Sequence, residues 1–95
     1  MSRQIWKFPI DLARTVEIEM PYGAEPLSVQ LQNGEICLWA LVDTSERKVM
    51  REVCIVGTGH PYDPCEVGRY VGTVVTQGGA LVWHVFIADS KEPHP

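Results

Sequence analysis

The stretch LSVQLQNGEICLWALV, residues 27–42, decides the fold. On both sides of Asn33-Gly34, apolar residues occupy at least every second position, which is the pattern of half-buried β-strands. Asn-Gly strongly favours a two-residue type I′ turn, because asparagine and glycine both tolerate a positive φ angle. The stretch therefore predicts a β-hairpin that turns at Asn33-Gly34.

A turn at this position fixes which residues of the two strands face each other. The pairs expected on the apolar face are Leu31 with Ile36, Val29 with Leu38, and Leu27 with Ala40. A shift of one residue would move this apolar set to the opposite face of the sheet, so the register and the apolar pattern support each other.

The rest of the chain also has the pattern of short strands separated by turns. Further strands are expected over residues 4–10, 16–20, 49–56, 70–76 and 80–87. Pro9 predicts that the first of these lies at a sheet edge, because proline cannot donate a ladder hydrogen bond. Both faces of the last strand are largely apolar, which favours a central position.

A second hairpin is expected around the glycine pair Gly78-Gly79. If these glycines are the two turn residues, the facing pairs are Val75 with Val82, Thr73 with His84, and Val71 with Phe86. The prediction for the whole chain is mostly β: a single-domain antiparallel β-sandwich or small barrel of about six strands. Asp11 to Arg14 has room for one short helical turn.

Length and composition limit the other possibilities. The chain has 95 residues, of which 45% are hydrophobic, and this predicts one domain over residues 1–89 with a flexible polar tail over 90–95. The net charge of -4 disfavours capture of nucleic acid, and the one basic cluster, Arg47, Lys48 and Arg51, has Glu46 and Glu52 on its two sides. No apolar run predicts a membrane span, and the first residues lack a signal-peptide pattern, so a reducing cytoplasm with three free cysteines is expected.

Several motifs resemble a family of small proteins encoded by tailed bacteriophages and carried as a domain of unknown function. Among the stretches that carry this resemblance are residues 6–9, 38–43, 55–61 and 78–86, with the sequences WKFP, LWALVD, IVGTGHP and GGALVWHVF. The resemblance covers nearly the whole chain and implies a viral, non-essential or host-directed role in a bacterial cytoplasm. It implies no activity.

The most unusual segment for function is Gly57-Thr58-Gly59-His60-Pro61. Its glycines allow a close backbone approach, and successive N–H groups in such a bend can form an anion-binding nest. Thr58 adds a hydroxyl and His60 an imidazole. The alternative interpretation is a β-bulge and exit turn that Pro61 terminates.

Two residues outside this segment complete the predicted ligand-binding set. Tyr62 follows the loop as a candidate stacking residue, and His84 lies in an apolar strand. His84 either joins His60 in one site or is a structural histidine bonded to a neighbour such as Thr73 across the hairpin.

Catalytic and metal-dependent alternatives have weaker patterns. Cys54, His60, Cys65 and His84 are zinc-ligand types without the close pairing of structural zinc sites, so no metal and no cofactor are expected. Cys65, His60 and Asp63 crowd into one loop without the separate supports that a thiol catalyst needs.

The function expected from the sequence is a non-catalytic binding protein in the host cytoplasm. It would sequester a small anionic or nucleotide-like ligand, or block a host protein such as a defence factor. A small hydrolase using the Thr58–His60 loop and a virion structural or assembly component remain the alternatives. A homodimer is expected, because a chain of 95 residues with exposed strand edges gains by covering more apolar surface.

Overall fold

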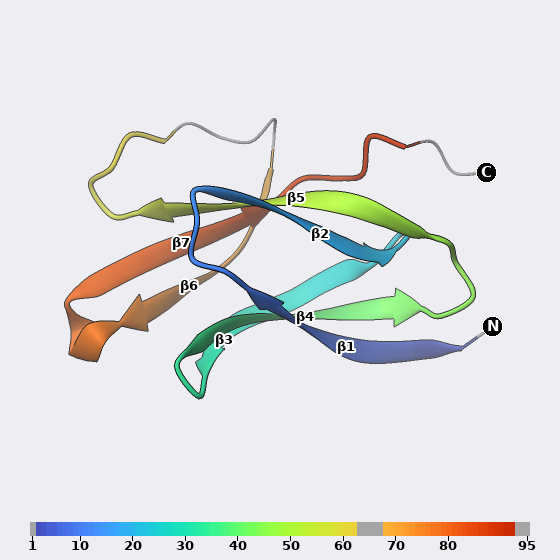
Figure 1. Cartoon of the computed structure of the whole chain (residues 1–95), viewed down its shortest axis with the longest axis horizontal. Helices are drawn as coiled ribbons and strands as arrows, with labels where there is room; N and C mark the ends of the chain where they lie inside the picture. The colour runs from blue at the N-terminus through green and yellow to red at the C-terminus, as the bar shows by residue number, and fades with distance from the viewer. Residues whose placement is uncertain (1, 63–67, 93–95) are drawn as a thin grey trace.

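The computed structural model describes residues 2–62 and 68–92, which form seven strands and one turn of 3-10 helix (Figure 1). The strands are β1 (Arg3–Ile10), β2 (Thr15–Pro21), β3 (Glu25–Gln32), β4 (Glu35–Asp43), β5 (Lys48–Gly57), β6 (Arg69–Thr76) and β7 (Leu81–Ile87), with η1 (Gln77–Gly79) before β7. They pair in the orders β1-β4-β3 and β2-β5-β7-β6, and every pairing is antiparallel. The predicted β-sandwich is confirmed, with the strands divided between two separate sheets.

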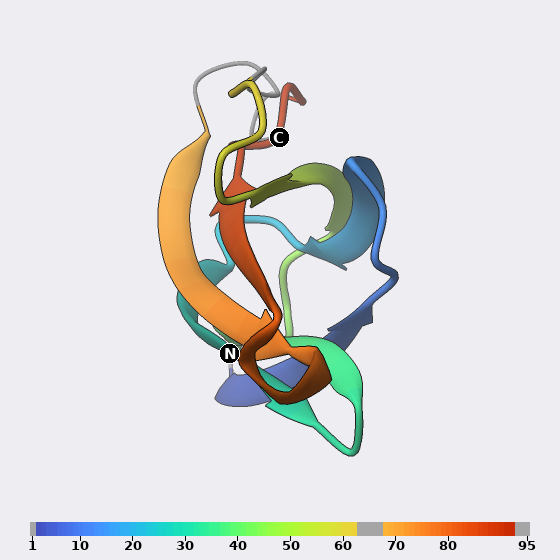
Figure 2. The ribbon, with the colours of Figure 1, turned by 90° about the vertical axis from the view of Figure 1, so that its left-hand side faces the viewer.

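The two sheets form layers with the core between them. Figure 1 shows β2 and β5 of the larger sheet above β1 and β4 of the smaller one, and Figure 2 shows the layers after a quarter turn. Edge strand β3 lies against edge strand β6, which brings the sheets together along one side. The buried side chains include Met20, Val29, Leu38, Val42, Val53, Val85 and Ile87. As predicted, β1 is an edge strand and β7 is internal.

The hairpin at Asn33-Gly34 is confirmed, with one correction. Both turn residues have positive φ angles, 52° at Asn33 and 81° at Gly34, as a type I′ turn requires. The expected pairs hold from Gln32–Glu35 to Ser28–Trp39, but the register then shifts and Ala40 pairs with Pro26. The expected Leu27–Ala40 pair is therefore wrong, because Leu27 lies at a bulge and is 46% exposed.

The second hairpin has the expected register over a longer turn. Val75 pairs with Val82 and Thr73 with His84, but Thr76 also pairs with Leu81, so the turn occupies residues 77–80 instead of two glycines alone. The expected Val71–Phe86 pair is wrong, because the register shifts between Tyr70 and Gly72. At this shift, a Cβ on Gly72 would lie 2.8 Å from Val29 Cγ1, so glycine permits the close approach of β6 to β3.

Residues 12–14 form bends in place of the short helical turn considered for residues 11–14, and the single helical turn of the described chain is η1. Within residues 2–62 and 68–92 there is no helix with the length and apolar character needed to cross a membrane. Residues 93–95 of the expected flexible tail lie outside the described residues, whereas Glu92 Oε1 pairs with Arg47 Nη1 at 2.9 Å.

The cysteines differ from the expectation of three free thiols. Cys37 is a buried free thiol. Cys54 is disulfide-bonded, so the expectation is wrong for this residue. Cys65 lies outside the described residues. Structural disulfides are typical of oxidising compartments, in contrast to the reducing cytoplasm that was expected from the sequence.

Replacing Gly34 by valine is expected to lower the free energy of unfolding by about 1–2 kcal/mol, because a β-branched residue strains a left-handed backbone. The φ angle at Gly34 is 81°, and a Cβ there would meet no atom within 4 Å. The penalty is therefore conformational, and Gly34→Asn is the matched control, since asparagine tolerates this region. Urea unfolding of both variants checks the turn, and equal stability of Gly34→Val and wild type would contradict it.

Candidate functional site

The loop after β5 is a tight turn that directs its polar side chains in different directions. The His60 N–H donates to Gly57 O and the Thr58 N–H donates to Val82 O, each at 3.1 Å, and Gly59 has a φ angle of 85°. A Cβ on Gly57 would lie only 2.8 Å from His60 Nδ1. Glycine at position 57 therefore lets the imidazole fold back against the end of β5.

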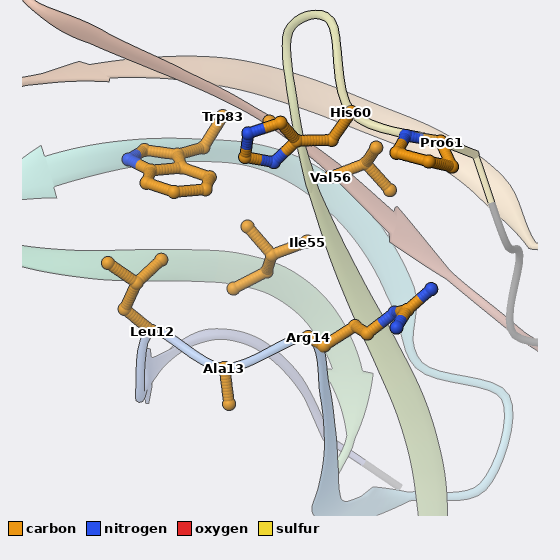
Figure 3. A pocket seen from close by; sticks show the side chains of 9 residues that line it. Leu12, Ala13, Arg14, Ile55, Val56, His60, Pro61 and Trp83 are labelled. Atoms are coloured by element: carbon orange, nitrogen blue, oxygen red, sulfur yellow. The ribbon is translucent and has the colours of Figure 1, made fainter.

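His60 borders a pocket of about 400 Å³ between this loop and the connection from β1 to β2 (Figure 3). The lining residues are Leu12, Ala13, Arg14, Ile55, Val56, Gly57, His60, Pro61 and Trp83. In Figure 3, Trp83 and His60 lie on one side of the pocket, and Leu12, Ala13 and Arg14 lie on the other. The pocket thus joins segments that are far apart in the sequence.

Backbone and side-chain contacts hold the two sides in place. The Ile55 N–H donates to Arg14 O at 3.1 Å, which ties the β1–β2 connection to β5. The Trp83 indole N–H donates to Thr76 Oγ1 at 3.0 Å, and the ring meets His60 edge-on at a centroid distance of 6.4 Å. The indole orientation is therefore fixed before any ligand arrives.

The chemistry of the pocket combines apolar walls with two cationic or proton-donating groups. Leu12, Ile55 and Trp83 offer apolar surface, while Arg14 carries a guanidinium and His60 an imidazole. Such a lining suits a small molecule with a flat apolar part and a negatively charged group.

Thr58 and His84 form a separate group on the opposite face of β7. Trp83 and His84 are consecutive strand residues, so their side chains leave opposite faces of the sheet. His84 Nε2 lies 2.7 Å from Thr58 Oγ1, and Nδ1 lies 3.0 Å from Thr73 Oγ1. Thr73 Oγ1 is in turn hydrogen-bonded to the Tyr70 hydroxyl. The expected contact of His84 with Thr73 is confirmed.

Tyr62 belongs to this second face as well. Its ring lies 5.2 Å from the ring of Phe86, and Tyr70 packs against the same phenyl ring at 5.6 Å. Of the predicted ligand-binding residues, the structure therefore brings Gly57 and His60 to the pocket, uses Gly59 in the turn, and places Thr58, Tyr62 and His84 elsewhere.

The structure describes only part of the residues that belong to the metal and thiol hypotheses. No group of three or more histidine, cysteine, aspartate or glutamate side chains gathers within the part of the chain that the structure describes. His60 and His84 are separated by β7. Asp63 and Cys65, the other members of the thiol hypothesis, lie outside the described residues.

Sequence reasoning missed Arg14 and Trp83 as pocket residues. Arg14 was considered only as part of a possible short helical turn and Trp83 only as part of the last strand, whereas the pairing of β2 with β5 and of β5 with β7 brings the two residues together. One signal for this was present in the sequence. Trp83 and His84 are consecutive strand residues whose side chains point to opposite faces of the sheet, so His60 can share a site with only one of them.

Comparison with known proteins gives a family but no activity. The sequence model of the family described as "Domain of unknown function (DUF7352)" matches residues 1–95. No curated protein and no solved structure matches the chain.

Proposed function

The chain belongs to the family of domains of unknown function DUF7352, and we propose that it is a non-catalytic binding protein for a small nucleotide-like anion. The observation that carries the proposal is the pocket in which Arg14 and His60 accompany the fixed indole of Trp83. Trp83 and the aliphatic walls would contact the base, and Arg14 and His60 would contact the phosphate.

The size and charge of the pocket support this assignment. A volume of about 400 Å³ lies within the usual range for small-molecule sites, which is roughly 300–1,000 Å³. The chain as a whole carries a net charge of -4, so long-range attraction does not favour an anion. Binding must therefore come from local groups, and Arg14 supplies a permanent positive charge at the pocket wall.

The resemblance to small proteins of tailed bacteriophages extends the proposal to a biological role. In this role the protein acts in the bacterial cytoplasm as a homodimer and either sequesters its ligand or blocks a host protein. The disulfide at Cys54 argues against this location, because a reducing cytoplasm keeps most thiols reduced, so the disulfide would have to form or persist there despite the reducing conditions. A structural role in the virion is the alternative, and the protein would then occur in stoichiometric copies in purified particles.

The proposed ligand class can be tested with three probes: adenosine 5′-monophosphate, adenosine and inorganic phosphate. Calorimetric titration is expected to show that the nucleotide binds more tightly than either of its parts. Combining His60→Ala with Arg14→Gln should reduce nucleotide affinity to that of adenosine, a loss of about tenfold or more for two charge-assisted contacts. Thr58→Val is the control, because the Thr58 side chain contacts His84 on the other face of β7, and this variant should bind the nucleotide as tightly as wild type.

Absence of nucleotide binding by the wild-type protein at millimolar concentration would contradict the proposal, as would equal binding by the double variant.

The contact of Thr58 Oγ1 with His84 Nε2 keeps a hydrolase as the second candidate function, because a hydroxyl beside an imidazole is the first part of a nucleophilic site. That function predicts hydrolysis of p-nitrophenyl acetate that Thr58→Val abolishes and that the pocket variants leave intact.

A further inference from the structure

A second pocket, of about 510 Å³, shares no lining residue with the pocket at His60. It lies where the turn after β2, the middle of β5, the start of β6 and the segment after β7 meet. Its lining residues are Tyr22, Gly23, Ala24, Glu25, Arg51, Arg69, Asp89 and Ser90. Most of these side chains are charged or polar, so the pocket suits a hydrophilic ligand.

Arg51 is the fixed part of this pocket. Its side chain is only 5% exposed, and two of its nitrogens are engaged with backbone carbonyls: Nε donates to Ala88 O at 2.8 Å, and Nη1 donates to Ala24 O at 3.0 Å. The third nitrogen, Nη2, lies 3.7 Å from Asp89 Oδ1, beyond hydrogen-bond distance. The guanidinium is therefore held rigidly, with its weakest contact at Nη2.

The positive charge of Arg51 is poorly compensated. Its ion-pair partner Asp89 is fully exposed, so water and salt weaken the attraction. Burial lowers the pKa of Arg51, Asp89 acts in the opposite direction, and the nearby charge of Arg69 lowers it further. Two positive charges thus act on each other at one pocket, and a carboxylate placed near both would relieve this.

The pocket also contains negative charge, which narrows the ligand class. Glu25 and Asp89 line it together with Arg51 and Arg69. A simple anion would be attracted by the arginines and repelled by the carboxylates. A simple cation would be attracted by the carboxylates and repelled by the arginines. A ligand with both charges a few ångströms apart is favoured by all four groups.

We propose that this pocket binds a small zwitterion of the amino-acid class. Its carboxylate would contact Arg51 Nη2 and Arg69, and its ammonium group would contact Glu25 and Asp89. Because Arg51 is already ordered by Ala88 O and Ala24 O, binding costs little further side-chain entropy. The proposal does not depend on the nucleotide pocket, because the two sites share no residue.

The test is a titration of the ¹⁵N-labelled protein with L-alanine, followed by NMR. Saturable amide shifts are expected at Gly23, Ala24 and Ser90, and sodium acetate or methylammonium chloride at equal ionic strength should give weaker binding. Arg69→Gln and Glu25→Gln, both at exposed positions, should each weaken L-alanine binding by about tenfold. Arg3→Gln removes an exposed charge that lines neither pocket and is the matched control.

Each other outcome overturns the proposal. Acetate binding as tight as that of L-alanine, with no effect of Glu25→Gln, would show a simple anion site. The absence of saturable shifts at Gly23, Ala24 and Ser90 up to about 50 mM L-alanine, an affinity weaker than about 2 kcal/mol, would show that the pocket holds no such ligand. Nucleotide binding at the pocket beside His60 would be unaffected by either result.

Discussion

Leu38→Ala is expected to lower the free energy of unfolding by about 2–5 kcal/mol, the range for a large-to-small substitution in a packed core. Leu38 is 0% exposed and lies on β4, the central strand of the smaller sheet, between Phe8 of β1 and Val29 of β3. Strands on both sides hold the β4 backbone in place, so the structure cannot collapse fully into the space left by the side chain. Urea unfolding at neutral pH measures the loss.

Leu27→Ala is the matched control for this prediction. It removes the same atoms from the other strand of the same hairpin, but Leu27 lies at the bulge and is 46% exposed. Its loss should therefore be well below that of Leu38→Ala, because less apolar surface returns to water. Equal losses in the two variants would contradict the inward orientation of Leu38.

Most of the strand architecture follows from local sequence patterns. Asn33-Gly34 specifies the turn, and alternation over residues 27–42 specifies which face is buried, because both signals depend only on near neighbours. The same reasoning predicted the edge position of β1 from Pro9 and the internal position of β7 from its two apolar faces. These are the features for which turn chemistry and residue pattern agree.

The bulges depend on contacts between sheets and were missed for that reason. The register of β6 shifts between Tyr70 and Gly72, where β6 passes so close to β3 that a Cβ on Gly72 would lie 2.8 Å from Val29 Cγ1. Residues 29 and 72 belong to different sheets, and no local pattern relates them. The bulge at Leu27 lies on β3, the strand that faces β6.

The candidate site was predicted in part for similar reasons. The glycines and His60 of the loop stand out in the sequence, and Gly57 does permit a close approach, although the group that approaches is the imidazole of His60. Arg14 reaches the same pocket through the pairing of β2 with β5, which the sequence did not indicate. The sequence left open whether His84 joins His60 in one site, and the alternation of Trp83 and His84 on β7 would have favoured the structural alternative for His84.

Arg51 shows how an available signal can be overlooked. In sequence it belongs to a basic cluster with Arg47 and Lys48, which suggests an exposed charge. Yet Val49, Arg51 and Val53 follow a period of two, so Arg51 shares the buried face of β5 with the two valines. A charged residue within an apolar alternation indicates a buried charge with specific partners.

Replacing Arg51 by methionine is expected to lower the free energy of unfolding by about 2–5 kcal/mol. The variant keeps an unbranched side chain of similar reach but leaves the buried carbonyls of Ala88 and Ala24 without their donors, at about 1–3 kcal/mol each. The opposing effect is relief of the desolvation that lowers the pKa of Arg51, since burying a charge is costly. We expect the lost hydrogen bonds to be the larger effect, because they tie the segment after β7 and the turn after β2 to β5.

The stability lost in Arg51→Met should not change with pH near neutrality, whereas a loss caused by titration of another group would change. A base whose pKa is lower in the folded state makes stability rise with pH only between its folded and unfolded pKa values, and for arginine the unfolded value lies far above neutral pH. Between about pH 5 and 9 the guanidinium is charged in both states, so the difference in unfolding free energy between wild type and Arg51→Met should stay constant.

Arg51→Lys keeps the charge but lacks the planar fork that reaches both carbonyls, so it should also be destabilised. If urea unfolding at pH 6 and 8 found Arg51→Met as stable as wild type and only Arg51→Lys weakened, desolvation would outweigh the two hydrogen bonds, and Arg51 would not be what holds this part of the sandwich together.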